Sequence, residues 1–158
     1  MSACTRPAQG PLPGDSEASF KPSERTLPIA KAPALPPWPE YATARSWPAL
    51  DAAPFVSRGH PPAGSVEVHV SPESRAAYLG LVRDTLFPDG TLLTELAARA
   101  GAGPSYAMRK SSGKWRFFQL DPEGAVLASG QLALCVGCHA EAPADGVFGL
   151  PSDPSAPR

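Results

Sequence analysis

Proline is distributed unevenly along this chain, and its distribution limits where a compact fold can form. Of the 21 prolines in 158 residues, nine lie within Met1–Pro39. Proline fixes φ and lacks a backbone N–H, so a dense run of prolines favours extended, polyproline-like structure. The same segment has few large apolar side chains to offset the entropy of ordering it. We therefore expect a disordered Pro-rich tether over residues 1–39, a folded domain over 40–150 and a flexible tail over 151–158.

Short strands dominate the expected structure of the central part. Ser65–Val70 has valine at every second position, which predicts a half-buried strand whose other side, with His69, faces solvent. Ser105–Lys110 and Lys114–Leu120 flank a Ser-Ser-Gly turn and predict a β-hairpin. Residues 91–98 fit a strand or a helix equally well by pattern. These segments together indicate several short, antiparallel strands.

Two helices are expected beside the strands. Ser71 as N-cap and Pro72 at the first helical position predict a helix start. Apolar residues at helical spacing continue to Leu86, before the Phe87-Pro88-Asp89-Gly90 turn. A second, short helix is expected over Gln131–His139. The predicted fold class is therefore α+β, mainly β: an antiparallel sheet with one main helix and a short C-terminal helix.

Five residues near the C-terminal end carry the clearest chemical signal. Cys135-Val136-Gly137-Cys138-His139 has the C-x-x-C-H spacing of c-type haem attachment. Each of the two thiols can add across one haem vinyl group, and the histidine that follows can ligate the iron. The sequence therefore predicts one covalently attached haem c, bound through Cys135 and Cys138, with His139 as axial iron ligand.

Three other uses of this thiol pair remain open on the sequence alone. A structural zinc site needs two further ligands, and the remaining histidines, His60 and His69, are nine residues apart. A thioredoxin-like redox pair usually follows an early strand of a βαβ unit, whereas this pair follows the predicted hairpin. The third alternative is a plain structural disulfide between Cys135 and Cys138.

Charge and hydropathy bear on partners and location. The formal net charge is -1, so nothing in the composition favours nucleic acid as a partner. The sequence contains no run of about 18 apolar residues, so no transmembrane helix is expected. Because c-type haem is normally attached outside the cytoplasm, a periplasmic location is expected. Met1-Ser2-Ala3-Cys4 resembles the end of a bacterial lipoprotein signal, which would place a lipid anchor on Cys4; the alternative is a chance cysteine in the tether.

Several further motifs occur in a fixed order between Val66 and Leu150. They are the strand Val66–Val70 followed by Ser71–Ser74, the Phe87–Thr91 turn, Tyr106–Met108, Trp115–Phe118, the C-x-x-C-H motif and the ending Asp145–Phe148. This order resembles the cytochrome P460 / cytochrome c′-β family. The resemblance implies that residues 40–150 form a P460-like haem c domain of an exported, homodimeric protein. It also implies a haem with one iron face open.

The resemblance leaves two chemistries to distinguish. Members of the P460 type carry a lysine cross-linked to the haem and oxidise hydroxylamine, whereas c′-β members lack that link and bind nitric oxide. Counted from Asp89-Gly90-Thr91, the cross-link position holds Glu95 here, or Thr94 with a one-residue gap. The sequence therefore favours a c′-β-like protein that binds nitric oxide or another small diatomic. The alternative is a hydroxylamine oxidase or peroxidase in which Glu95 exchanges protons over the haem.

A third possible function is electron transfer, and it depends on whether a protein side chain fills the sixth iron position. If a protein side chain fills it, the haem mainly transfers electrons to a redox partner that the sequence does not identify. Met108, His60 and His69 are the candidate ligands, although Met108 also fits a core position. The alternative to a role for Glu95 over the haem is an exposed strand residue that faces Arg109 or Arg99. An apolar wall over the haem, or ordinary core packing, is expected of Phe87, Leu93, Phe117 and Phe118.

Overall fold

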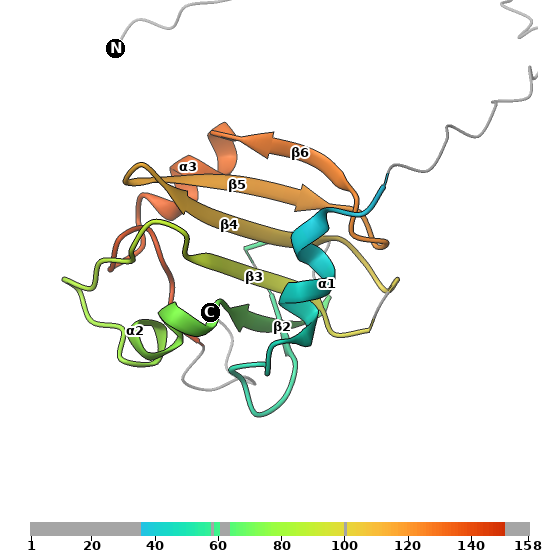
Figure 1. Ribbon diagram of the computed structural model, residues 1–158, viewed down its shortest axis with the longest axis horizontal. Coiled ribbons are helices and arrows are strands. Elements are labelled where there is room, and N and C mark those ends of the chain that lie inside the picture. The colour runs from blue at the N-terminus through green and yellow to red at the C-terminus, as the bar shows by residue number, and fades with distance from the viewer. Residues whose placement is uncertain (1–35, 58, 61–63, 100, 151–158) are drawn as a thin grey trace, which may run out of the picture. The chain divides into compact units, whose positions relative to one another are not determined.

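Antiparallel strands make up most of the fold. The computed structural model describes residues 36–57, 59–60, 64–99 and 101–150. Within them, each strand of a six-stranded sheet pairs with its neighbour in sequence (Figure 1). The strands are β1 (Phe55–Val56), β2 (Ser65–Val70), β3 (Leu92–Ala97), β4 (Ser105–Ser111), β5 (Lys114–Leu120) and β6 (Val126–Gly130). The predicted first strand and hairpin are confirmed, and residues 92–97 form a strand rather than a helix.

Three short helices accompany the sheet. They are α1 (Pro39–Ser46), α2 (Arg75–Leu79), which follows the 3-10 turn Pro72–Ser74, and α3 (Ala133–His139). The predicted class, α+β and mainly β, is confirmed, as is a short helix that carries the C-x-x-C-H motif. Across the described residues, no helix combines the length and apolar character of a membrane span.

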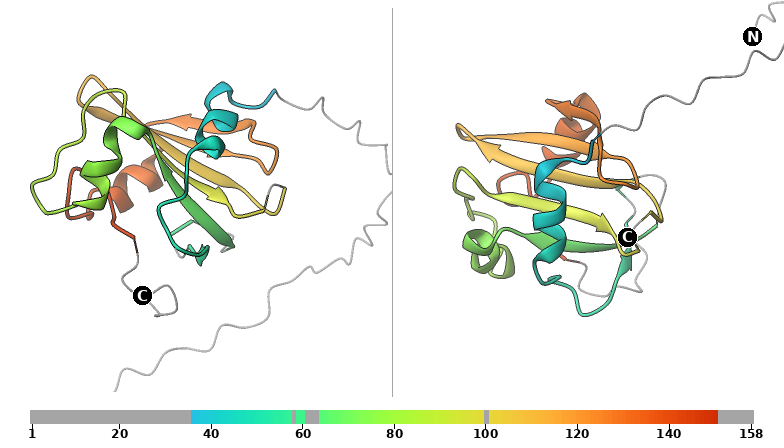
Figure 2. Two further views of the ribbon diagram at one scale, coloured as in Figure 1. Left: turned by 60° about the horizontal axis from the view of Figure 1, so that its bottom comes forward. Right: turned by 45° about the vertical axis from the view of Figure 1, so that its right-hand side comes forward.

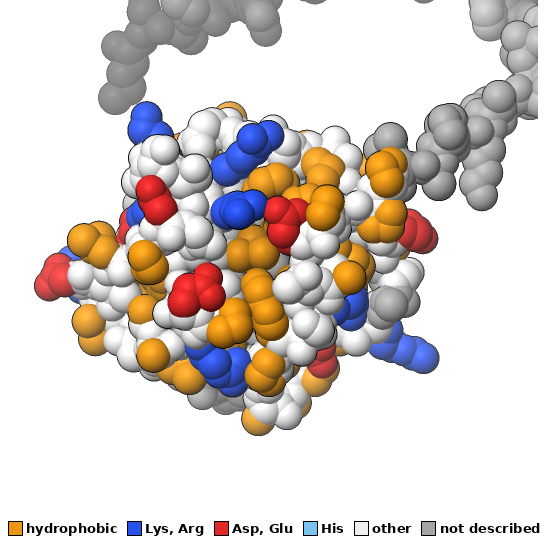
Figure 3. All heavy atoms as spheres, viewed as in Figure 1, with side chains coloured by type: hydrophobic (Ala, Val, Ile, Leu, Met, Phe, Trp, Pro, Cys, Tyr) orange, Lys and Arg blue, Asp and Glu red, His pale blue; other side chains and the backbone are white. Residues whose placement is uncertain are grey.

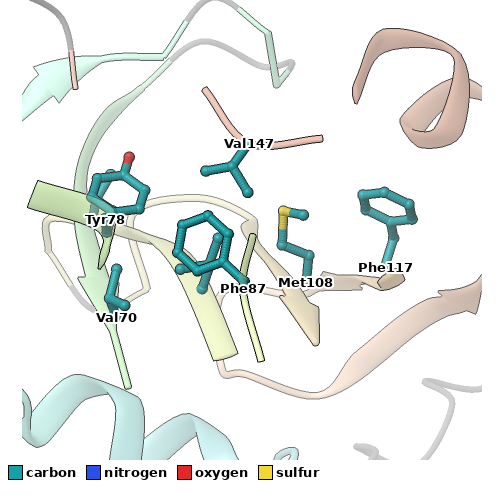
Figure 4. Close-up of a cluster of buried hydrophobic side chains, with 8 residues drawn as sticks. Val70, Tyr78, Phe87, Met108, Phe117 and Val147 are labelled. Atoms are coloured by element: carbon teal, nitrogen blue, oxygen red, sulfur yellow. The ribbon is translucent and has the colours of Figure 1, made fainter. Parts of the chain in front are cut away.

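The two faces of the sheet have separate cores, which we call the α1 face and the α3 face. Figure 2 shows α1 lying across the strands on one side and α3 on the other. The α1-face core consists of Trp38, Tyr41, Ala44, Leu92, Leu96, Ala107 and Leu120. The α3-face core consists of Val68, Val70, Tyr78, Phe87, Leu93, Met108, Phe117 and Val147, most of which are labelled in Figure 4. Both faces are therefore covered, unlike those of a one-sided sheet.

Helix α1 belongs to the packed structure, although its flanking residues are rich in proline. Trp38 N–H donates to Gly124 O at 2.7 Å, and Pro37 forms a β-bridge with Ala125. Gly124 has φ +90°, and the Tyr41 ring lies where its Cβ would be, so only glycine fits there. On this side, Figure 3 shows hydrophobic side chains between acidic and basic ones. The packing therefore begins before residue 40, at Pro37.

The prediction that His69 faces solvent is wrong. Only 4% of His69 is exposed, and its Nδ1 lies 2.8 Å from Trp47 O. In the sheet His69 pairs with Thr94, which shares the α1 face with Leu92 and Leu96. The valine alternation correctly identified one buried side of β2, but it could not show that α1 and the chain after it cover the other side.

The helix expected to run on to Leu86 is much shorter. Helix α2 ends at Leu79, and Gly80 follows as its C-cap. Val82 and Leu86 are 66% and 77% exposed, so of the apolar stripe past Gly80 only Leu81 packs against the α3-face core. A turn closed by Val82 N–H donating to Thr85 Oγ1 replaces it. Helical spacing alone was misleading here, because a helix this short depends on tertiary packing.

Two of the predicted segments lie outside the described residues. These are the tether up to residue 35, with Cys4, and the tail over residues 151–158. The tether, the tail and the lipid anchor stay predictions.

Candidate functional site

Helix α3 presents both motif thiols with little packing of its own. None of its seven residues is buried, and Leu134 is 90% exposed. Cys138 is exposed, whereas Cys135 is half-buried and packs against the α3-face core. Both thiols are free, so this structure does not have the disulfide that was one alternative. A helix that leaves its apolar side chains uncovered is suited to carry an attached apolar group.

His139, the last residue of α3, has its imidazole held in one orientation. Its Nδ1 lies 2.7 Å from Gly146 O. A carbonyl oxygen can only accept a hydrogen bond, so in the neutral ring Nδ1 carries the proton and Nε2 keeps its lone pair. Burial lowers the pKa of His139, with His60 adding to the effect, while Gly146 and Glu95 oppose it. The ring therefore favours the neutral tautomer that binds metals through Nε2.

The carbonyl that orients His139 is itself fixed by a buried ion pair. Lys110 Nζ on β4 lies 2.5 Å from Asp145 Oδ2, and the two side chains are 7% and 14% exposed. Phe87 N–H donates to the same carboxylate at 2.9 Å, and Trp115 Nε1–H donates to Asp145 O at 2.5 Å. Asp145 and Gly146 have φ of +47° and +73°. This left-handed turn, held to the sheet, places Gly146 O against His139.

Aromatic side chains surround the His139 ring. Its centroid lies 5.0 Å from that of Phe117 and 5.6 Å from that of Phe148, which meets it edge-on. His60 follows at 6.3 Å. The imidazole therefore sits in a largely apolar setting with a second imidazole nearby.

Glu95 lies on the α3 face, on the same side of the sheet as His139. It occupies the middle of β3 and pairs with Tyr106 of β4. Glu95 Oε1 lies 3.1 Å from His60 Nδ1. Both atoms are buried, and neither has a hydrogen-bond partner among the described residues. Arg109, the expected alternative partner of Glu95, is bound to Glu40 of α1 at 2.8 Å.

The contact between His60 and Glu95 was not predicted from the sequence. His60 lies in the loop before β2 and stacks on Tyr106, with centroids 4.2 Å apart and planes 16° apart. Burial raises the pKa of Tyr106, with the charges of Glu95 and Cys135 adding to it. Glu95 thus acts electrostatically on both Tyr106 and His139. No local pattern signals this cluster, because strand pairing and a loop bring it together.

A cavity of about 400 Å³ adjoins this cluster. His60, Glu95 and Tyr106 line one part of it, and small residues such as Ala97, Ala102 and Gly103 line much of the rest. Its size is in the range of small-molecule sites, and polar groups converge on one side. Small molecules can therefore approach Glu95 and His60 through this cavity.

The cysteine environment does not resemble that of a redox pair. Burial raises the pKa of Cys135, and the neighbouring Cys138 adds to this, while a backbone hydrogen bond opposes it. Redox-active cysteines need the opposite shift, since the thiolate is the reactive form.

The fold separates the two histidines that a zinc site would need in addition to the two cysteines. His69 lies on the α1 face against Trp47, whereas His60 contacts Glu95 on the α3 face. The two histidines are therefore on opposite sides of the sheet. Throughout the described ranges, no group of three or more His, Cys, Asp or Glu side chains is arranged to hold a bare metal ion.

The other sequence candidates divide between the two cores. Met108 is 6% exposed and packs with Phe117 and Val147 in the α3-face core (Figure 4). Phe87 and Leu93 belong to the same core. Phe118 does not, because it points to the α1 face and stacks on Trp38 with centroids 4.8 Å apart. Phe118 therefore does not contribute to the expected apolar wall. Thr94, the other residue considered for the cross-link position, is also buried on the α1 face.

Comparison with known proteins adds nothing to these observations. No family model, no curated protein and no solved structure matches this chain. The resemblance to the cytochrome P460 / cytochrome c′-β family therefore depends on the motifs quoted above.

The described residues fit a covalently attached haem. Cys135, Cys138 and His139 lie on one exposed helix, and the His139 tautomer leaves Nε2 for an iron ion. Phe117 and Phe148 supply an apolar surround, and the ion pair of Lys110 with Asp145 fixes the loop that orients the ligand. Outer contacts of this kind are typical of protein metal ligands.

Proposed function

We propose that this chain is a mono-haem c-type cytochrome of the c′-β type, which binds nitric oxide or another small diatomic. One haem c is attached through Cys135 and Cys138, with His139 as axial ligand. When bound, the haem iron supplies the position at which the diatomic is held. The observation that carries the proposal is the His139 Nδ1 contact with Gly146 O, on the helix that bears both thiols.

The remaining features of the proposal follow from haem attachment and from the family resemblance. The protein is exported to the periplasm, where the haem is attached. The Met1–Cys4 motif separately supports a lipid anchor on Cys4. The resemblance supports a homodimer. A redox partner returns the iron to the ferrous state that binds nitric oxide.

A hydroxylamine oxidase or peroxidase is the second candidate, because Glu95 lies on the same face of the sheet as His139 and lines the cavity. Its carboxylate is 19% exposed, contacts His60 and adjoins the cavity. A carboxylate and an imidazole in contact can pass a proton to and from a small substrate. Glu95 supports this candidate only as a proton-transfer group, since the cross-link of the P460 type requires lysine.

Haem attachment is tested by expressing the chain in a periplasm with the cytochrome c assembly machinery. We expect one haem per chain by pyridine haemochrome, retained through acid–acetone extraction. Adding nitric oxide to the ferrous protein should shift the Soret band. Colourless protein would refute the haem, and an unchanged spectrum would refute ligand binding. Turnover of hydroxylamine or peroxide that is lost in Glu95→Gln would favour the second candidate.

A further inference from the structure

A second histidine stands at ligand spacing from His139. The ring centroids of His60 and His139 are 6.3 Å apart, and the ring planes differ by 22°. Imidazole–metal bonds in proteins are about 2.0–2.1 Å, so two imidazoles on opposite sides of one ion have ring centres about 6 Å apart. The observed spacing of the two ring centres therefore matches the spacing expected of two imidazoles that bind one metal ion from opposite sides.

His60 also has the support that a metal-binding histidine needs. Its Nδ1 lies 3.1 Å from Glu95 Oε1, and its ring stacks on Tyr106 at 4.2 Å. The two atoms are in contact without a hydrogen bond, but a carboxylate beside Nδ1 still favours Nε2 as the nitrogen for a metal. His139 is held more firmly, because its Nδ1 makes a hydrogen bond with Gly146 O, whereas the contact of His60 with Glu95 is not a hydrogen bond. Both rings are thus set up to use Nε2.

The other two candidates for the sixth position are placed less well. His69 is buried on the α1 face. Met108 is packed into the α3-face core, where its side chain contributes to packing with Phe117 and Val147. His60 combines spacing from His139, a carboxylate at Nδ1 and a position beside the cavity.

We propose that His60 is the sixth iron ligand of the resting protein, and that nitric oxide binds by displacing it. This inference rests on the proposed haem function and adds a regulatory step to the same site. If His60 occupies the iron in nine molecules of ten, the apparent affinity for the diatomic falls about tenfold. Glu95 then acts as a positioning residue, because it orients His60 and does not itself touch the bound ligand.

The test compares the full chain with His60→Ala and with His69→Gln, which changes a histidine on the opposite face. Each protein is matured with the haem, its haem content is measured by pyridine haemochrome, and its ferric spin state by absorption and electron paramagnetic resonance. We expect a low-spin ferric haem in the parent and in His69→Gln, and a high-spin haem in His60→Ala. Ferrous His60→Ala should bind nitric oxide about tenfold more tightly than the parent.

The outcomes separate this inference from the proposed function. Protein that carries no haem refutes the proposed function itself. Haem that is attached but high-spin in the parent, or low-spin in His60→Ala, refutes His60 as the ligand while leaving haem attachment intact. In Glu95→Gln, we expect the ferric low-spin fraction to fall without loss of haem. An unchanged spin state there would refute the positioning role of Glu95.

Discussion

His69 and His139 make the same contact on opposite faces of the sheet, but only one is placed to bind a cofactor. Nδ1 of His69 lies 2.8 Å from Trp47 O, and Nδ1 of His139 lies 2.7 Å from Gly146 O. His69 is 4% exposed beneath the chain around α1, whereas His139 follows Cys138 on an exposed helix. A carbonyl partner thus fixes the tautomer of a histidine, but ligand binding also needs access and an attachment point.

The two faces of the sheet also differ in how exposed their ion pairs are, as the pairs of Arg109 and Lys110 show. These two residues are neighbours on β4. Arg109 points to the α1 face and pairs with Glu40, with side chains 48% and 33% exposed. Lys110 points to the α3 face and pairs with Asp145, with side chains 7% and 14% exposed. The α1 face therefore keeps its ion pair at the surface, while the α3 face buries one next to the loop that orients His139.

The largest expected effect comes from removing the two attachment thiols. Replacing Cys135 and Cys138 together by alanine should abolish covalent haem, because no thioether can form. Pyridine haemochrome after acid–acetone extraction measures the loss. Cys4→Ala is the matched control and should keep one haem per chain. A double variant that still retains its pigment would contradict the assignment of the motif.

The buried and exposed ion pairs should differ strongly in stability. Lys110→Met leaves the Asp145 charge buried without its partner and should lower the free energy of unfolding by about 3–5 kcal/mol. Arg109→Met on the same strand should cost less than about 1 kcal/mol, because its pair is solvent-screened. Urea unfolding of each variant gives the comparison. Equal losses would show that burial at Asp145 does not strengthen the pair.

Replacing His69 should affect the stability of the fold, whereas replacing His139 should affect ligation of the haem. His69→Ala removes a buried hydrogen bond and should lower the free energy of unfolding by about 1–3 kcal/mol, with the spectrum of the attached haem unchanged. His139→Ala should change that spectrum, because the axial ligand is lost. Thermal unfolding and ferrous absorption spectra are recorded on both variants. A changed spectrum in His69→Ala would invalidate the contrast between the faces.

The smallest expected effect is a shift in thiol reactivity. Because burial raises the pKa of Cys135, its thiolate should form only at a higher pH than in an ordinary cysteine, which titrates near about 8.5. The rate of iodoacetamide alkylation against pH measures this, on haem-free Cys4→Ala, Cys138→Ala protein. A cysteine in a short unstructured peptide is the control. Faster alkylation of Cys135 than of the peptide at pH 7 would favour a redox-type thiol.

Local patterns in the sequence predicted β2, the β4–β5 hairpin and α3, but they missed β1 and misjudged the other two helices. The bounds of β2 were predicted exactly from the Ser65–Val70 alternation, and the β4–β5 hairpin from Ser112 and Gly113, which both take positive φ. Helix α1 was missed because the prolines before it suggested a tether, although Pro39 is suited to a first helical turn. The helix beyond Gly80 was overestimated, because periodicity does not show whether a core exists to receive it.

The site was predictable only where its residues are adjacent in the sequence. The spacing of Cys135, Cys138 and His139 was visible directly. The ion pair between Lys110 and Asp145 joins residues 35 apart. The partners of Glu95 and His69 depend on strand register and on which helix covers which face. Such contacts follow from the packing of distant segments, so no local pattern carries them.

The sequential order of the sheet has a consequence for assembly. Because β1 to β6 each pair with the strand next to them in the chain, every ladder closes a comparatively short loop. The ladders can therefore form before α3 adds its contacts, so the sheet against which His139 packs does not need α3 in order to form. Haem attachment would then complete a scaffold that the polypeptide has already built by itself.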